Sequence, residues 1–196
     1  QGNGQTELIE ALTGLRRPAG GAVVYSGDEI THASVRARHR MGIAHIPEDR
    51  QRSGMVASFS VAENMVLDTY YDDRFSTGLQ VRWPKVNEAA AALATEFDVR
   101  TPSVFLKAGH LSGGNQQKLV VARELSRETK LVIAAQPTRG LDVGSIEYIH
   151  KRLVDARAEG DGVFIVSSEL DEIMGLSARI LVMFTGRSLG EFDDDG

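Results

Sequence analysis

Cysteine is absent from this sequence of 196 residues. A chain without cysteine forms no disulfide, offers no thiolate to a metal ion and has no cysteine nucleophile. Long apolar runs are absent as well, because none approaches the roughly 18 consecutive apolar residues typical of a membrane-spanning helix. We therefore expect a protein of a reducing compartment that does not itself cross a membrane.

Positive net charge is also lacking. Lys and Arg number 22 against 27 Asp and Glu, which gives a formal net charge of −5. Proteins that hold nucleic acid by bulk electrostatics have the opposite balance, so no nucleic-acid partner is expected. With 42% hydrophobic and 25% charged residues, the composition is globular. The length suffices for one well-filled core with a small appended subdomain, but not for two ordinary domains.

Short β-branched runs alternate with segments of helical periodicity. Strands are predicted at 22–25, 42–46, 131–135, 163–166 and 180–184. Helices are predicted at 6–12, 84–97, 115–125 and 146–158. The last helix lies between two almost purely apolar strands, which predicts a βαβ unit with parallel strands covered on both faces.

Turn residues predict two antiparallel hairpins outside the βαβ unit. Ser26-Gly27-Asp28 interrupts the segment 22–30, and Thr185-Gly186-Arg187 separates 180–184 from 188–192. The stretch from about Val61 to Gly109 shows no strand pattern and is predicted to be mainly helical. The sequence thus predicts an α/β fold with a parallel core, an antiparallel β segment and a helical subdomain.

A glycine-rich stretch runs directly into the first predicted helix. This glycine loop consists of Gly2, Asn3, Gly4, Gln5, Thr6 and Glu7. Such a loop lets a phosphate approach the free N–H groups and the positive dipole end of a helix. The phosphate-loop pattern has Lys where Gln5 stands but retains Thr6 at the magnesium-binding position. The alternative is a turn that only caps the helix.

A second motif opens the helix predicted at 115–125. We call it the signature segment, and it reads Leu111-Ser112-Gly113-Gly114-Asn115-Gln116-Gln117-Lys118. Ser112 can cap the helix. Ordinary capping does not explain the two glycines, which weaken a helix start through their entropy cost. Close approach of an anion to the first N–H groups does explain them.

The signature segment resembles the signature of the ATP-binding cassette family, the motor domains of ABC transporters. The order of the family's motifs continues downstream. Ala135-Gln136-Pro137-Thr138 stands where the family has Asp-Glu-Pro-Thr, and a Leu141-Asp142 turn follows. Ser168 occupies the position of the family's switch His, and Glu48 that of the glutamine in its glutamine loop. The resemblance covers the whole chain and implies a P-loop NTPase fold of the RecA-like type.

Four departures from the family pattern imply an impaired nucleotide site in this chain. Gln5 supplies no cation, Ala135 no carboxylate for magnesium, Gln136 no general base and Ser168 no imidazole. Loss of one charge-assisted hydrogen bond weakens binding roughly ten- to a hundredfold, and general-base catalysis is worth about 10²–10⁴ in rate. We expect ATP to bind weakly here, magnesium to bind weakly at Thr6, and hydrolysis at this site to be negligible.

The intact signature segment implies a role at another site. In the family, two cassettes pack head to tail, with ATP between the phosphate loop of one and the signature of the other. By resemblance, the ATP of a consensus-type partner cassette would meet Leu111, Ser112, Gly113, Gly114 and Gln116. Asp142 would reach across the same interface. The alternative is a packing scaffold or regulatory cassette without part in turnover.

Further strings resemble the second cassette of fused two-cassette proteins that drive bacterial importers of sugars or nucleosides. They are Pro47-Glu48-Asp49-Arg50, the signature segment and Pro-Thr-Arg-Gly-Leu-Asp-Val-Gly, whereas Ala-Ala-Gln-Pro-Thr favours the nucleoside group. The implied partners are the first cassette, membrane permease subunits and, indirectly, a periplasmic or lipoprotein solute-binding protein. The implied location is the cytoplasmic face of the membrane. A soluble cassette ATPase acting on ribosomes or DNA is the other alternative.

By the same resemblance, residues 1–196 form a single cassette whose helical subdomain covers about 61–126. The family's phosphate loop follows a central strand, and Gln1 already lies in that loop, so we expect the first strands to lie upstream. A local basic cluster is predicted to be solvated or ion-paired, and it comprises Arg36, Arg38, Arg40, Arg50 and Arg52.

Overall fold

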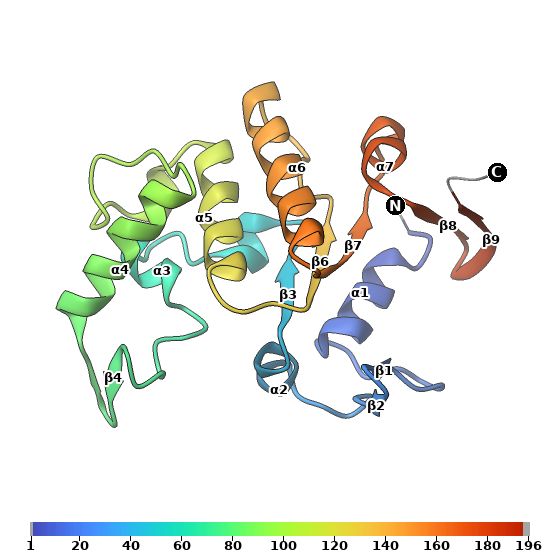
Figure 1. Ribbon diagram of the computed structural model, residues 1–196, viewed down its shortest axis with the longest axis horizontal. Helices are drawn as coiled ribbons and strands as arrows, with labels where there is room; N and C mark the ends of the chain where they lie inside the picture. The colour runs from blue at the N-terminus through green and yellow to red at the C-terminus, as the bar shows by residue number, and fades with distance from the viewer. Residues whose placement is uncertain (1, 194–196) are drawn as a thin grey trace. The chain divides into compact units, whose positions relative to one another are not determined.

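The computed structural model describes residues 2–193 and divides into two compact units. The first unit contains the residues up to His45, Thr129–Gln136 and the residues from Leu153 onward. The second unit contains Ile46–Glu128 and Pro137–Arg152. Figure 1 labels the helices and strands along the chain.

The first unit holds most of the β structure. Its helices are α1 (Gln5–Thr13), α2 (Val35–Arg40) and α7 (Leu170–Leu176). Its strands are β1 (Val24–Tyr25), β2 (Asp28–Glu29), β3 (Ile43–Ile46, whose last residue belongs to the second unit), β6 (Leu131–Ala135), β7 (Gly162–Val166), β8 (Arg179–Phe184) and β9 (Arg187–Asp193). The helix α6 (Val143–Ala158) connects β6 to β7 and has residues in both units.

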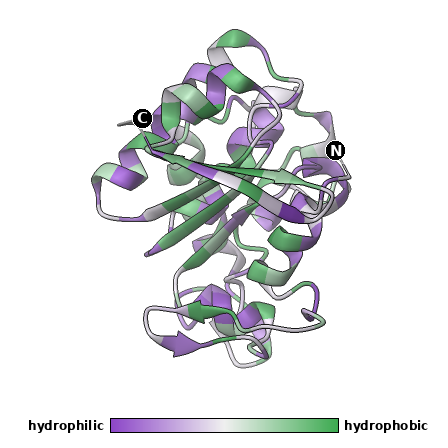
Figure 2. Ribbon diagram, turned by 90° about the vertical axis from the view of Figure 1, so that its right-hand side faces the viewer, coloured by the Kyte–Doolittle hydropathy of each residue, from purple (hydrophilic) through white to green (hydrophobic). Residues whose placement is uncertain are grey.

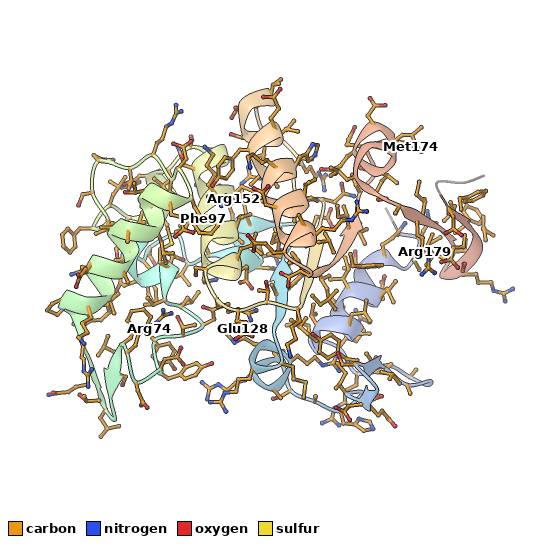
Figure 3. All side chains as sticks on the ribbon, in the orientation of Figure 1. Arg74, Phe97, Glu128, Arg152, Met174 and Arg179 are labelled. Atoms are coloured by element: carbon orange, nitrogen blue, oxygen red, sulfur yellow. The ribbon has the colours of Figure 1, made fainter. Side chains whose placement is uncertain are left out.

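The second unit is mainly helical. Its elements are the π-helical turn η1 (Arg50–Gly54), α3 (Val61–Met65), β4 (Ser76–Thr77), β5 (Gln80–Val81), α4 (Trp83–Glu96), the 3-10 turn η2 (Ala108–His110) and α5 (Gly113–Leu125). Helices α3, α4 and α5 pack against one another through buried apolar side chains, among them Val61, Val86 and Leu119. In Figure 3 the guanidinium of Arg152 lies beside Phe97, and its Cζ atom is 4.3 Å from the ring centroid.

The predicted βαβ unit is confirmed. Strand order in the main sheet is β3-β6-β7, and β6 pairs with β7 in parallel from Leu131↔Gly162 to Ala135↔Val166. The strands of this sheet are coloured mostly hydrophobic in Figure 2. Strand β6 is buried, as predicted, but residues 163–166 of β7 are only half-buried. The expectation that both strands are covered on both faces is therefore wrong for β7 among residues 2–193.

Both predicted hairpins are confirmed. Strands β1 and β2 pair antiparallel, and β8 pairs with β9 across a turn in which Thr185 and Gly186 have φ values of 47° and 76°. Two positive φ angles are typical of the turn that suits the twist of a two-residue hairpin. The β8–β9 pair forms a sheet of its own and exposes Leu181, Phe184 and Phe192.

The prediction for residues 61–109 is partly wrong. This stretch contains the short antiparallel pair β4–β5, and its long helix is limited to α4. Two-residue strands are too short to show the alternation from which a strand is predicted. The helix α2 was missed because its residues are mostly polar, and only the N-cap Ser34, whose side chain accepts from the Ala37 N–H, marks its start.

Arg38 is buried, contrary to its predicted place in a solvated basic cluster. Its side chain is 1% exposed, and the guanidinium donates to five carbonyl oxygens over 2.6–3.1 Å. The acceptors are Ala11, Leu12, Ile30, Thr31 and Ala33. Two of them lie at the end of α1, where helix carbonyls lack partners within the helix. Arg38 thus fixes the helix that follows the glycine loop.

We expect Arg38→Met to lower the free energy of unfolding by roughly 3–5 kcal/mol, because it leaves several buried carbonyl groups without donors. Urea unfolding followed by circular dichroism measures the change. Arg36→Met is the matched control, since Arg36 lies in the same helix and is exposed; its effect should stay within about 0.5 kcal/mol. Equal effects of the two substitutions would contradict the assigned role of Arg38.

Candidate functional site

The glycine loop has the backbone geometry that a bound phosphate needs. Gly2 and Gly4 have φ values of 89° and 95°, a region that glycine adopts without steric cost. Gly4 is the N-cap of α1 and provides no side-chain cap, so the first turn keeps N–H groups that no capping side chain satisfies. Thr6 and Glu7 are exposed. These features fit the anion-binding loop and the capping turn alike, so the anion-binding loop stays a prediction.

Asn3 anchors the glycine loop to the β8–β9 turn. Its carbonyl oxygen accepts from the Gly186 N–H at 2.9 Å, and its side-chain oxygen accepts from the Thr185 N–H at 3.2 Å. A Cβ on Gly4 would lie 3.0 Å from the Gly186 Cα, so the turn approaches closely only because Gly4 lacks a side chain. Sequence analysis missed this brace, for which the Thr185-Gly186 turn was the available signal.

The last residue of β6, Ala135, and the residue that follows it, Gln136, have uncharged side chains. Ala135 is 4% exposed and belongs to an apolar cluster with Ile9 of α1. Gln136 has a φ of 46°, and its side-chain oxygen accepts from the N–H and the hydroxyl of Ser168 at 3.3 and 3.2 Å. The structure therefore brings together two of the predicted departures, Gln136 and Ser168. An amide bonded to a hydroxyl offers neither a general base nor a cation.

The residues present do not fit a resident magnesium ion. Magnesium in proteins is usually bound by one or two carboxylates together with water and phosphate oxygens. At the predicted site, Thr6 offers a neutral hydroxyl and Ala135 offers no oxygen on its side chain. Within residues 2–193, no group of three or more His, Asp or Glu side chains is arranged to hold a metal.

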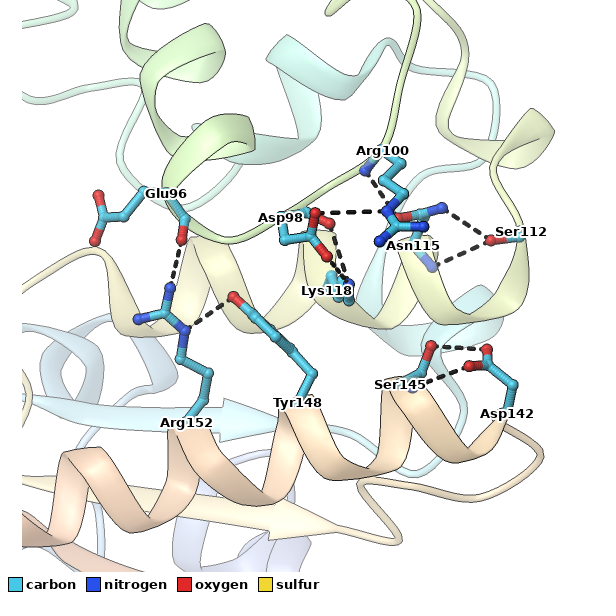
Figure 4. A network of polar contacts seen from close by, with 10 residues as sticks. All are labelled: Glu96, Asp98, Arg100, Ser112, Asn115, Lys118, Asp142, Ser145, Tyr148 and Arg152. Carbon is cyan, nitrogen blue, oxygen red and sulfur yellow. Dashed lines mark hydrogen bonds and ion pairs between the residues drawn. The ribbon is translucent and has the colours of Figure 1, made fainter.

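The signature segment begins α5 with a capped first turn. Ser112 is the N-cap, and its hydroxyl accepts from the side-chain amide of Asn115 at 3.0 Å and, more weakly, from the Asn115 backbone N–H (Figure 4). Gln116 donates to the Leu111 carbonyl at 3.0 Å. Ser112 is exposed, whereas Leu111, Gly114 and Gln116 are buried. Among these predicted contact residues, the buried ones hold the segment's shape and Ser112 faces solvent.

Gly114 is required by packing within the chain. A Cβ at this position would lie 2.2 Å from the Ser145 hydroxyl and 3.1 Å from an Asp142 carboxylate oxygen. At Gly113 the nearest atom is Nη2 of Arg50, 2.8 Å away at the end of a flexible side chain. One of the two glycines therefore has a structural reason that sequence analysis did not consider.

Asp142 is hydrogen-bonded within its own chain. It immediately precedes α6, and its two carboxylate oxygens accept from the Ser145 N–H at 3.0 Å and from the Ser145 hydroxyl at 2.7 Å. The hydroxyl bond, followed by the backbone bond, lowers the pKa of Asp142 below its ordinary value of 3.8. The carboxylate is thus ionised at neutral pH, exposed, and held at the start of α6.

Glu48 is paired with a residue that sequence analysis did not connect to it. Its carboxylate accepts from Arg139 Nη1 at 2.5 Å, and Arg50 Nη1 donates to the Arg139 carbonyl at 3.2 Å. Glu48 and Arg139 are 91 residues apart in sequence. Only the fold reveals this pair.

A polar network surrounds the last residue of the signature segment, Lys118 (Figure 4). The Lys118 ammonium bonds to the Asp98 carboxylate and lies 4.5 Å from the Tyr148 ring centroid. The bond from Lys118 is the main cause that lowers the pKa of Asp98. Arg152 donates to the Tyr148 hydroxyl at 2.9 Å. These contacts hold α5 beside the first turns of α6, where the signature segment meets Asp142 and Ser145.

We expect Gly114→Ala to lower the free energy of unfolding by about 1–3 kcal/mol through overpacking. Gly113→Ala is the matched control and should lower it less, because the Arg50 side chain is able to swing away. Thermal and urea unfolding of both variants measure the difference. The combination of Gly114→Ala with Ser145→Ala should destabilise less than the sum of the two single changes, and strict additivity would contradict the assigned contact.

Comparisons with known proteins agree with the fold. The sequence pattern of the family described as ABC transporter matches residues 1–139. The guanosine import ATP-binding protein NupO of Bacillus subtilis (strain 168) is 48% identical over 186 residues, which are 95% of this chain and 36% of that protein. The nucleoside import ATP-binding protein NupA of Lactococcus lactis subsp. cremoris is also 48% identical, over 189 residues, 96% of this chain and 37% of that protein.

A relative named for a sugar is nearly as similar. The glucose import ATP-binding protein TsgD13 of Haloferax volcanii is 44% identical over 192 residues, 97% of this chain and 35% of that protein. The chain thus spans about a third of the length of these relatives.

Solved structures confirm the predicted fold class. A dimeric post-hydrolysis state of the ATP-binding cassette MJ0796 bound to ADP and Pi has a TM-score of 0.81 at 19% identity, covering 97% of this chain and 81% of that chain. A nucleotide-free ATP-binding cassette from an ABC transporter has a TM-score of 0.77 at 21% identity, with coverages of 97% and 76%. The fold is that of the P-loop NTPases, and the family pattern matches well over half of the chain. This chain belongs to the ABC transporter family.

Proposed function

We propose that this chain is the degenerate second cassette of an importer's ATP-binding protein, and that it completes the ATP site of the first cassette. The single observation that carries the proposal is the contrast between its two motifs. The signature segment presents an exposed Ser112 at a capped helix start, whereas the glycine loop keeps its shape but has lost its charged partners. The names of the relatives support nucleosides or sugars as the imported solutes.

The chain's own nucleotide site is proposed to bind ATP weakly and not to hydrolyse it. Backbone N–H groups at the start of α1 remain available to phosphate, and Gln5 replaces the cation that would strengthen the contact. The Gln136–Ser168 hydrogen bond occupies the side chains at both positions where acid–base and γ-phosphate contacts are expected by resemblance.

The signature segment is proposed to act on ATP held by the partner cassette. The capped start of α5 offers a positive helix end with two glycines, which suits the terminal phosphate. Ser112 would donate its hydroxyl, and the neighbouring Asp142 would line the same interface. The water-activating carboxylate would then come from the first cassette, because Gln136 in this chain has none.

Membrane permease subunits are proposed as further partners, with a solute-binding protein acting through them. In the described part of the chain, no helix is long and apolar enough to span a membrane, so any membrane contact of these residues is made at a surface. The loop at Glu48 and the helical part of the second unit are the proposed contact. The location would be the cytoplasmic face of the membrane.

The open apolar surfaces of β7 and β8 are proposed to be covered in the whole protein. Strand β7 is only half-buried, and β8 leaves Leu181, Val182 and Phe184 exposed in a separate two-stranded sheet. An apolar face of a sheet favours a covering layer of helix or sheet, whereas an unpaired edge favours a further strand. The single-cassette boundaries 1–196 and the subdomain at about 61–126 stay predictions.

We expect Ser112→Asp to reduce ATP hydrolysis by the full two-cassette protein at least tenfold. Asp caps a helix as well as Ser does, so α5 should persist while a carboxylate repels the terminal phosphate. Steady-state phosphate release measures the rate. Ser112→Asn is the matched control, because it caps equally well without charge and its amide can still donate a hydrogen bond, so it should lose clearly less activity than Ser112→Asp.

An unchanged rate in Ser112→Asp would favour the scaffold or regulatory alternative. That alternative has a specific observation behind it, since Gly114 is required by packing alone. Ser112 is therefore a better site for this test than Gly114, where any side chain would displace Ser145. Copurification with ribosomes or DNA instead of a permease would favour the soluble ATPase.

Gln136 provides a separate test of the impaired site. We expect Gln136→Ala to leave ATP hydrolysis by the full protein within about twofold, because no general base is removed. A catalytic base at this position would instead be worth about 10²–10⁴ in rate. The same phosphate-release assay applies, with Ser112→Asp as the positive control, and a hundredfold loss would disprove the proposed division of labour.

A further inference from the structure

Three charged residues of the second unit meet beside the signature segment. The carboxylate of Glu48 bonds to the Arg139 guanidinium at 2.5 Å. The Arg50 guanidinium donates from Nη1 to the Arg139 carbonyl at 3.2 Å, and its Nη2 lies 2.8 Å from the place of a Cβ on Gly113. The side chain and the main chain of Arg139 are therefore both engaged by the segment 48–50.

The turn that contains Arg139 also reaches the other glycine of the signature segment. Three residues downstream, Asp142 is bonded to Ser145, whose hydroxyl approaches Gly114 more closely than a side chain there would permit, and an Asp142 carboxylate oxygen also lies close to Gly114. On the other side of Arg139, the Pro137 carbonyl accepts from the Gln117 side-chain amide at 2.8 Å. Residues 137–142 thus contact α5 through the Gln117–Pro137 hydrogen bond and the close approach to Gly114. They contact Glu48 through the Arg139 ion pair.

The exposure of the Glu48–Arg139 pair argues against a mainly stabilising role. The Glu48 and Arg139 side chains are 34% and 55% exposed. Ion pairs exposed to this degree contribute little to stability because solvent and salt screen them and ordering the side chains costs entropy. A second Arg–Glu pair, Arg16 with Glu10, has nearly the same exposure, 54% and 32%, and the same kind of contact. It lies in the first unit, whereas the signature segment belongs to the second.

We propose that Arg139 is a positioning residue of the signature segment, and that its ion pair with Glu48 sets how Ser112 and the two glycines are presented to the partner's ATP. The inference rests on the proposed function. Movement of the loop at Glu48 pulls on Arg139, and the 137–142 turn passes this displacement to Gly114 through Asp142 and Ser145. Glu48 and Arg139 touch no nucleotide themselves.

A double-mutant cycle in the full two-cassette protein with its permease tests this inference. Glu48→Gln and Arg139→Gln are each expected to lower kcat for ATP hydrolysis at least threefold while KM for ATP stays within twofold. ATP is held mainly by the partner cassette, so loss of positioning acts on turnover rather than on binding. The double variant is expected to be no slower than the slower single variant, because both changes remove the same interaction.

Charge exchange separates positioning from damage to the fold. The doubly substituted Glu48→Arg/Arg139→Glu protein is expected to recover at least half of the lost kcat, and Tm of every variant should stay within a few degrees of the wild type. Arg16→Gln is the matched control for loss of an exposed Arg–Glu pair and should leave kcat unchanged.

Two outcomes would overturn the inference while leaving the proposed function intact. They are single variants with wild-type kcat, and single variants whose losses multiply in the double variant without recovery on charge exchange. Failure of the proposed function is recognised by a different result, namely a Ser112→Asp protein that hydrolyses ATP at the wild-type rate. The two failures are therefore read from different variants in one assay.

Discussion

The close approach of Gly114 to Ser145 is the contact on which the rest of the second unit's site depends. It places the start of α5 against the first turn of α6, where the Asp142 carboxylate accepts from the N–H and the hydroxyl of Ser145. One helical turn further along α5, Lys118 engages Asp98 and the face of Tyr148. A residue larger than glycine at 114 would collide with the Ser145 hydroxyl and so disturb its bond to Asp142.

In the first unit the glycine loop has kept its backbone conformation, but the charged side chains that the family has around nucleotide are replaced by Gln5, Ala135 and Gln136. The positive φ angles at Gly2 and Gly4 and the brace through Asn3 keep an anion-ready loop at the start of α1. At the ends of β6 and β7, the side chains of Gln136 and Ser168 satisfy each other. A neutral pair of this kind needs no ligand to satisfy its polar groups.

The parts that were predicted correctly from sequence depend on local pattern. Strands β6 and β7 and the β8–β9 hairpin follow from apolar runs and turn residues, and the motifs then gave the family. Arg38 was misjudged because its acceptors lie in two stretches of the chain, 11–12 and 30–33, and the first of these is 26 residues or more away in sequence. The Glu48–Arg139 pair was missed for the same reason, since 91 residues separate the partners.

The two glycines of the signature segment have different structural reasons, so each residue of the motif needs its own explanation. Gly114 is explained by contacts inside the chain, and Gly113 leaves room that only a mobile Arg50 side chain occupies. Packing therefore accounts for Gly114, and capping of α5 accounts for Ser112, whereas neither accounts for Gly113. A residue that the fold does not require is one whose presence argues for a ligand, so Gly113 is the strongest argument in this motif for a phosphate at the helix start.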